Sequence, residues 1–158
     1  MFITSIPFRL FVILLSVLAA ASDGAAASTA DDVLTLYHTF AEAQNRRDLP
    51  AVRRTLLESP RFLWISDGTA VWGPDALIER MQQFQQSEIW KVEPDLDKAV
   101  VVPLADGSAM LHVPLTLVIG STAPGPDRLR FLVEVICLRT SGGWRIAALL
   151  TTTEKGPT

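Results

Sequence analysis

The chain has 158 residues, of which 49% are apolar, and its 14 basic and 17 acidic residues give a formal net charge of −3. A mildly acidic chain without a block of Lys or Arg lacks the charge that binds a phosphate backbone, so we expect no nucleic-acid partner. Its apolar content is too high for an intrinsically disordered chain. The single Cys excludes an internal disulfide, and the length fits one folded domain.

The N-terminal segment has the pattern of an export signal. Arg9 precedes a run of twelve residues, 10–21, that is apolar except for Ser16. A helix needs about 20 apolar residues to span a bilayer, whereas a signal peptide needs about 7 to 15. Small residues suited to cleavage follow, so we predict a signal peptide over 1–27, with cleavage after residue 21 as an alternative. We therefore expect an exported protein, periplasmic or secreted. An uncleaved membrane anchor is the other interpretation.

Residues 28–158 then make up the mature protein. Without the first 27 residues, about 44% of the chain is apolar and the net charge is still −3, as in an ordinary soluble domain. We expect no stable association with a membrane after the signal is removed. Cys137 lies in an apolar strand pattern, which is typical of a buried thiol rather than a reactive one.

The first half of this domain has mainly helical periodicity. Apolar residues recur at i, i+3, i+4, i+7 and i+8 in the first segment, and an Asp-Gly pair further along is typical of a hairpin turn. The predicted elements are a helix over 31–44 capped by Ser28 or Thr29, a short helix from Asp48 that ends at Ser59-Pro60, strands over 62–66 and 69–72, and a third helix opened by 73–75.

The second half has strand patterns separated by residues that favour turns. The predicted strands are 89–92, 99–104, 109–119, 129–139 and 144–153. Three helices, a small hairpin and a strand meander indicate one α+β domain whose antiparallel sheet is covered by helices.

Several motifs occur in a characteristic order. They are the run FAEAQNRRDLPAV at 40–52, the Asp-Gly pair at 67–68, WGPDALI at 72–78 and GGWRI at 142–146. In this order they resemble the nuclear transport factor 2-like superfamily and, within it, the polyketide-cyclase (SnoaL-like) and related uncharacterised domains. The resemblance covers nearly all of 28–158. It implies a cone, in which a strongly curved antiparallel sheet and three N-terminal helices enclose one deep, mostly apolar pocket.

This fold hosts isomerases, dehydratases, epoxide hydrolases, cyclases and proteins without chemistry, so it does not settle function. The resemblance implies that an isomerase would carry its carboxylate base and its Tyr donor where this chain has Ile65 and Phe40, and neither side chain can move a proton. We therefore expect a binding module whose pocket holds a small apolar ligand against Phe40, Trp64, Ile65 and Trp90.

An enzyme of isomerase, dehydratase or cyclase type is the alternative, with Glu134, Tyr37 and His112 as candidate catalytic residues. Glu134 interrupts an apolar strand, and a carboxyl on an apolar face must be paired, hydrated or protonated. It is either an acid with a raised pKa or a cross-strand partner of an Arg such as Arg145. Tyr37 lies one turn before Phe40 on the same stripe, and a core Tyr is its other interpretation. His112 is either a base or a packed, hydrogen-bonded strand residue.

The strand over 129–138 is apolar on both faces, which implies that both faces are covered. We expect a homodimer through the outer sheet face, and a non-catalytic dimerisation module with a filled cavity is a third alternative. The chain has two His, one Cys and no clustered ligand set, so we expect no metal site. No motif indicates a cofactor.

Overall fold

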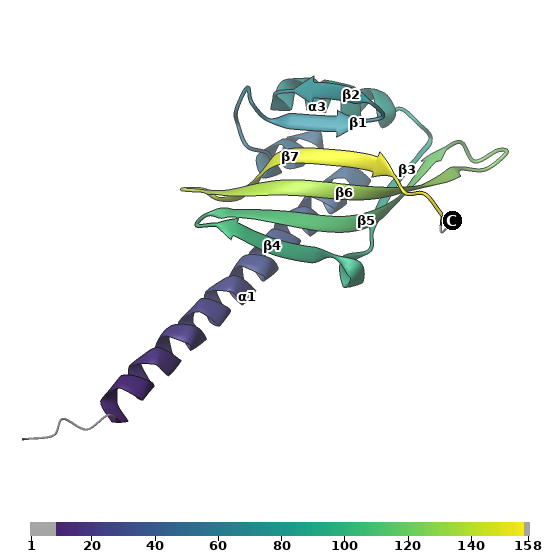
Figure 1. The fold of residues 1–158 in the computed structure, drawn as a ribbon. Coiled ribbons are helices and arrows are strands. Elements are labelled where there is room, and N and C mark those ends of the chain that lie inside the picture. Colours follow the sequence, from purple (N-terminus) through teal and green to yellow (C-terminus); the bar gives the residue numbers. More distant parts are fainter. Residues whose placement is uncertain (1–8, 157–158) are drawn as a thin grey trace, which may run out of the picture.

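A computed structural model describes the backbone of residues 9–156 and the side chains of residues 27–156. Figure 1 shows a curved sheet with helices packed against one of its faces and with α1 extending away from it. The described part contains three α-helices and a seven-stranded, mostly antiparallel sheet that does not close into a barrel. The predicted α+β class is therefore confirmed.

The helices are α1 (Arg9–Asn45), α2 (Leu49–Thr55) and α3 (Pro74–Phe84). Asp48 caps α2, because its carboxylate accepts a hydrogen bond of 2.9 Å from the backbone N–H of Ala51. The predicted cap at Ser28 or Thr29 is wrong. Both residues lie inside α1, since the Ala-rich stretch around them favours continuation of a helix.

Strands β1 (Leu63–Ser66) and β2 (Thr69–Trp72) form the predicted hairpin. Asp67 and Gly68 at its turn have φ values of 51° and 68°. A two-residue turn with both φ values positive matches the twist of the strands, which is why Asp-Gly is favoured there.

The other strands are β3 (Ile89–Pro94), β4 (Val100–Ala105), β5 (Ser108–Gly120), β6 (Asp127–Thr140) and β7 (Gly143–Thr153). The sheet has the order β2-β1-β7-β6-β5-β3, and β4 pairs with the other end of β5. Strand β1 runs parallel to β7, and the remaining pairs are antiparallel. Only β5, β6 and β7 form a consecutive meander, because β3 and β4 share the long strand β5. A short 3-10 turn, Leu96–Lys98, separates those two strands.

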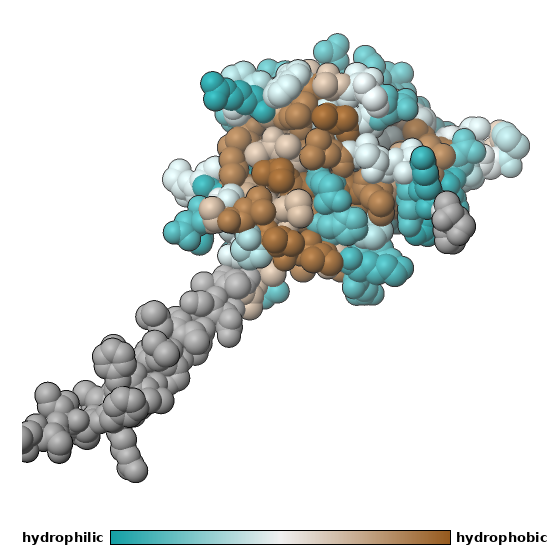
Figure 2. Space-filling model, viewed as in Figure 1, coloured by the Kyte–Doolittle hydropathy of each residue, from teal (hydrophilic) through white to brown (hydrophobic). Residues whose placement is uncertain are grey.

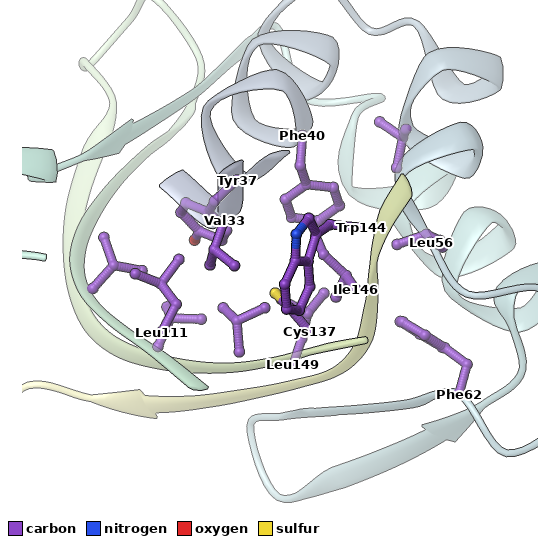
Figure 3. Close-up of a cluster of buried hydrophobic side chains, with 14 of the residues drawn as sticks. Val33, Tyr37, Phe40, Leu56, Phe62, Leu111, Cys137, Trp144, Ile146 and Leu149 are labelled. Atoms are coloured by element: carbon purple, nitrogen blue, oxygen red, sulfur yellow. The ribbon is translucent and has the colours of Figure 1, made fainter. Parts of the chain in front are cut away.

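Side chains of the long strands alternate between two faces. Leu111 and Val113 of β5 and Val133 and Val135 of β6 point to the inner face and are buried against the helices. Figure 3 shows this core, in which Tyr37 and Phe40 extend from α1 toward the sheet that carries Leu111, Ile146 and Leu149. The outer face is the one turned toward the reader in Figures 1 and 2, and it is brown over a wide area.

Cys137 belongs to this core and is fully buried. Burial raises the pKa of its thiol to about 12, so it is uncharged at neutral pH, as expected for a packing residue. Within the described residues, no helix is both long enough and apolar enough to cross a membrane.

Candidate functional site

A cavity of about 890 Å³ lies between the inner face of the sheet and the helices. Its volume is within the range of about 300 to 1,000 Å³ that is usual for small-molecule sites. Most of its lining is aliphatic or aromatic. The apolar lining residues are Tyr37, Phe40, Trp64, Met81, Phe84, Trp90, Val92, Leu115, Leu117, Ile119, Leu129, Phe131, Val133 and Leu149.

Three aromatic rings form one wall of this cavity. Phe84 of α3 stacks on Trp90 of β3, with ring centroids 6.3 Å apart and planes 7° apart. The ring of Trp64 of β1 meets Phe84 edge to face at 6.4 Å. The guanidinium of Arg80 covers the rings of Trp64 and Phe84 at 5.6 and 5.1 Å and supplies cation–π attraction from outside the lining. A helix, a hairpin strand and an edge strand therefore meet at this wall.

Tyr37 and Phe40 form the wall that α1 contributes. They lie one helical turn apart, and their rings are 5.9 Å apart. Tyr37 is 2% exposed, and burial raises the pKa of its phenol well above the ordinary value. The hydroxyl therefore stays protonated, and it is a neutral hydrogen-bond donor at the cavity.

Charged residues also belong to the lining of the cavity. Arg128 and Arg130 of β6 line it and are ion-paired with Glu93 and Glu154 at 2.9 and 2.6 Å. Hydrogen bonds from Lys91 and Arg128 lower the pKa of Glu93, and the hydrogen bond from Arg130 lowers the pKa of Glu154. These charges compensate one another, so this part of the lining has no large excess of either sign.

The candidate catalytic residues are not brought together at the cavity. His112 and Glu134 are cross-strand partners in β5 and β6, and His112 Nδ1 lies 2.6 Å from Glu134 Oε1. Both residues stand between inward-facing core residues, so they point to the outer face, away from Tyr37. Glu134 thus has a polar partner, as expected for a carboxyl on an apolar strand, but that partner is His112 and not an Arg.

Of the expected ligand contacts, Phe40, Trp64 and Trp90 line the cavity. Ile65 does not. It pairs with Leu150 on the outer face, because it follows the inward-facing Trp64 by one residue.

Sequence patterns do not single out Phe84 or the inward-facing residues of β5 and β6 that line the cavity, which are Leu115, Leu117, Ile119, Leu129, Phe131 and Val133. Their alternation along two long apolar strands was visible, but it did not reveal which face was the inner one. Among the described residues, no three His, Cys, Asp or Glu side chains are grouped as metal ligands.

No protein-family model and no curated protein matches this chain. Solved structures do resemble it. A protein from Novosphingobium aromaticivorans, provisionally named a scytalone dehydratase, has a TM-score of 0.72 and 9% identity, covering 85% of this chain and 89% of that one. A protein from Streptomyces avermitilis, provisionally named a dehydratase of the NTF2-like family, has a TM-score of 0.71 and 13% identity over 82% and 98%.

An NTF2-like protein of unknown function from Shewanella oneidensis has a TM-score of 0.62 and 18% identity, covering 77% of this chain and 96% of that one. At these identities the likeness shows the fold. The chain is an α+β protein with the nuclear transport factor 2-like fold, as its motifs predicted. Proteins named for different activities share this fold, so the fold by itself assigns no activity.

Proposed function

We propose that the protein binds a small, largely apolar, planar molecule in the cavity between α1, α3 and the sheet. The observation that carries this proposal is the wall formed by Trp64, Phe84 and Trp90 on a cavity of about 890 Å³. Flat aromatic side chains offer a large contact area to a flat ligand.

Tyr37 supplies the means to orient such a ligand. Its protonated hydroxyl is a hydrogen-bond donor at the α1 wall of the cavity. This donor favours a ligand that carries at least one hydrogen-bond acceptor, such as a carbonyl oxygen.

The export signal predicted over 1–27 places this binding outside the cytoplasm in our proposal. A mature domain of residues 28–158 would then capture an apolar molecule in the periplasm or the medium. Processing is tested by the N-terminal sequence of the protein recovered after expression in its host: Ser28 or Ser22 as the first residue supports export, and an intact Met1 contradicts it.

The arrangement gives no support to the isomerase, dehydratase or cyclase alternative that uses Glu134 with Tyr37 or His112. A general base must come within hydrogen-bond reach of the group from which it takes a proton. Glu134 and His112 lie on the face opposite the cavity, so they cannot act with Tyr37 on one ligand. For this reason we propose binding and no reaction.

The binding proposal is tested with N-phenyl-1-naphthylamine, a neutral planar probe whose emission rises in apolar surroundings. We expect saturable binding with one probe per chain. Leu117→Trp, which fills the cavity from β5, is expected to weaken binding at least about ten-fold. Leu104→Trp adds the same side chain at a position that is 55% exposed and outside the lining, and it is the matched control. No binding by the parent protein, or equal binding by both variants, would overturn the proposal.

A further inference from the structure

Gln44 of α1 is a polar residue in the wall of the apolar cavity. It lines the cavity, and the residue is only 6% exposed. Residues that are seven positions apart complete nearly two turns of a helix, so Gln44 lies on the same side of α1 as Tyr37 and about 10 Å further along the helix axis. Phe40 lies between them and also lines the cavity. The helical wall therefore has two separate polar positions.

The side-chain amide of Gln44 has no hydrogen-bond partner among the described residues. Its backbone carbonyl accepts from Gln85 Nε2 at 3.3 Å, but no hydrogen bond within the described part of the chain uses the side chain. The indole nitrogens of Trp90 and Trp144 are also unpartnered, but they are sealed from solvent, whereas Oε1 and Nε2 of Gln44 are not. The amide is thus left unsatisfied by the protein and stays accessible to a molecule in the cavity.

Two contacts hold Gln44 next to the aromatic wall. Its carbonyl accepts from the residue that directly follows Phe84 in the chain. Asn45, the next residue of α1, bonds to the backbone of Val92 in β3 at 2.9 and 2.7 Å. Trp90 lies two residues before Val92 and so faces the same side of β3. The amide of Gln44 is therefore a neighbour of the wall against which a flat ligand packs.

The chemistry of a carboxamide restricts the group that can satisfy it. A Gln side chain presents an acceptor oxygen and a donor nitrogen side by side in one plane. A single group that pairs with both atoms must carry a donor next to an acceptor in the same plane. The N–H and C=O of a lactam within a flat ring have this arrangement.

The charges of the lining favour a neutral ligand. Arg128 and Arg130 are already ion-paired with Glu93 and Glu154, and the lining also holds the acidic Asp67. The polar group at the aromatic wall, the Gln44 amide, is itself uncharged. A charged ligand group beside it would lose its hydration without gaining an opposite charge there.

We propose that the ligand of this cavity is a neutral, planar heteroaromatic molecule with a lactam edge. Its N–H donates to Gln44 Oε1, and its C=O accepts from Gln44 Nε2, while its rings pack against Phe84 and Trp90. This inference rests on the proposed function and adds the chemical class of the ligand. A site built to form such hydrogen bonds rejects an analogue that lacks one of them, because a buried polar group then stays unpaired.

Competition with N-phenyl-1-naphthylamine compares two lactams. One is 2-quinolinone, and the other is its N-methyl derivative, which has the same rings and carbonyl but no N–H. We expect the parent protein to bind 2-quinolinone at least about ten-fold more tightly, since the methylated ring leaves Gln44 Oε1 unpaired.

The outcomes separate this inference from the proposed function. Equal affinities for the two lactams, or no competition by 2-quinolinone while the naphthylamine probe binds, overturn the inference and leave the binding of apolar molecules standing. If the naphthylamine probe does not bind either, both proposals fall.

Gln44→Leu tests whether the preference arises at this side chain. Leu is apolar and of similar size, so we expect the variant to keep its affinity for the naphthylamine probe and to bind the two lactams equally tightly. Gln82→Leu makes the same change at an exposed position of α3 outside the lining, and it should retain the preference. A preference that persists in Gln44→Leu arises from crowding at the methyl group and refutes the assigned role of Gln44.

The unfolding temperature without ligand distinguishes a binding role from a structural one. Because the Gln44 amide has no partner in the described chain, Gln44→Leu should leave this temperature unchanged or raise it. A lower unfolding temperature would show that the amide stabilises the fold, and it would contradict the pairing of this amide with a ligand.

Discussion

The ring of Phe84, at the end of α3, lies parallel to the ring of Trp90 in β3, with centroids 6.3 Å apart. This contact joins the third helix to the edge strand that follows it in the chain, and both rings line the cavity. Because Phe84 is 36% exposed, it contributes more to the shape of the cavity than to the burial of the core.

Phe84→Ala is expected to affect binding more than stability. Removing the ring takes away one side of the aromatic wall, so we expect affinity for N-phenyl-1-naphthylamine to fall at least about ten-fold. The loss in free energy of unfolding should be only about 1 to 2 kcal/mol, because the ring is partly exposed. Probe titration and urea denaturation measure the two quantities.

Phe62→Ala is the comparison for this variant. Phe62 is fully buried and does not line the cavity, so its truncation should cost about 3 to 5 kcal/mol of unfolding free energy. If Phe84→Ala destabilises the chain as much as Phe62→Ala does while probe affinity stays unchanged, Phe84 is a core residue and not part of the binding wall.

Local signals predicted much of this fold. The Asp67-Gly68 turn, the apolar stripe that contains Phe84 and the alternation in the long strands are all properties of neighbouring residues. Which face of a strand points inward depends instead on pairing with distant strands, and a difference of one residue reverses the face. For that reason Ile65 was expected in the pocket and lies outside it, and the sequence left the orientation of Glu134 open.

Sequence patterns also do not predict hydrogen bonds between residues that are far apart in the chain. Arg47 lies two residues after the end of α1. In the structure its guanidinium donates to the backbone carbonyls of Gln85, Ser87 and Glu88 at 2.8, 2.8 and 2.9 Å. These carbonyls lie about 40 positions further along the chain, just after α3. No periodicity or spacing connects such partners, because the segments that follow α1 and α3 meet only in the folded domain.

Asn45, the last residue of α1, provides a second prediction. Its side-chain amide donates to Val92 O at 2.9 Å, and its oxygen accepts from Val92 N at 2.7 Å. The amide therefore replaces a neighbouring strand for one residue of β3. Asn45→Ala would leave both backbone groups of the buried Val92 unpaired, and we expect the free energy of unfolding in urea to fall by about 2 kcal/mol.

Asn45→Asp distinguishes the contributions of the two hydrogen bonds to stability. A carboxylate still accepts from Val92 N but cannot donate to Val92 O, so its effect at neutral pH should lie between those of Asn45 and Ala. An Ala variant as stable as the parent protein would show that water or a backbone shift replaces this contact.

The thiol of Cys137 should be unreactive in the folded protein. Burial raises its pKa to about 12, and the thiolate is the form that attacks disulfide reagents. We expect no reaction with Ellman's reagent at pH 8 in buffer and one thiol per chain in unfolding concentrations of urea. A fast reaction in buffer would mean that the core around β6 opens readily, contrary to the packing described here.

Glu88, next to the start of β3, should make the stability of the fold depend on pH in the acidic range. Its carboxylate accepts from Thr122 N at 2.9 Å and from Thr122 Oγ1 at 2.8 Å, and these hydrogen bonds lower its pKa below the ordinary 4.5. Since the folded-state pKa is the lower one, the folded state binds protons more weakly than the unfolded state does. The stabilisation is therefore complete above about pH 4.5 and is lost as the pH falls through the lowered folded-state value.

Glu88→Gln removes this titration, so its unfolding temperature should approach that of the parent protein as the pH is lowered from 6 toward 3. Glu79 on α3 is exposed and has no ion pair among the described residues. Glu79→Gln removes the same charge from an exposed position on α3 and is the matched control. Calorimetric scans between pH 3 and 7 measure the unfolding temperatures of the three proteins. If the difference in unfolding temperature between Glu88→Gln and the parent protein stays constant with pH, the Glu88 carboxylate does not hold the turn between β5 and β6 against β3.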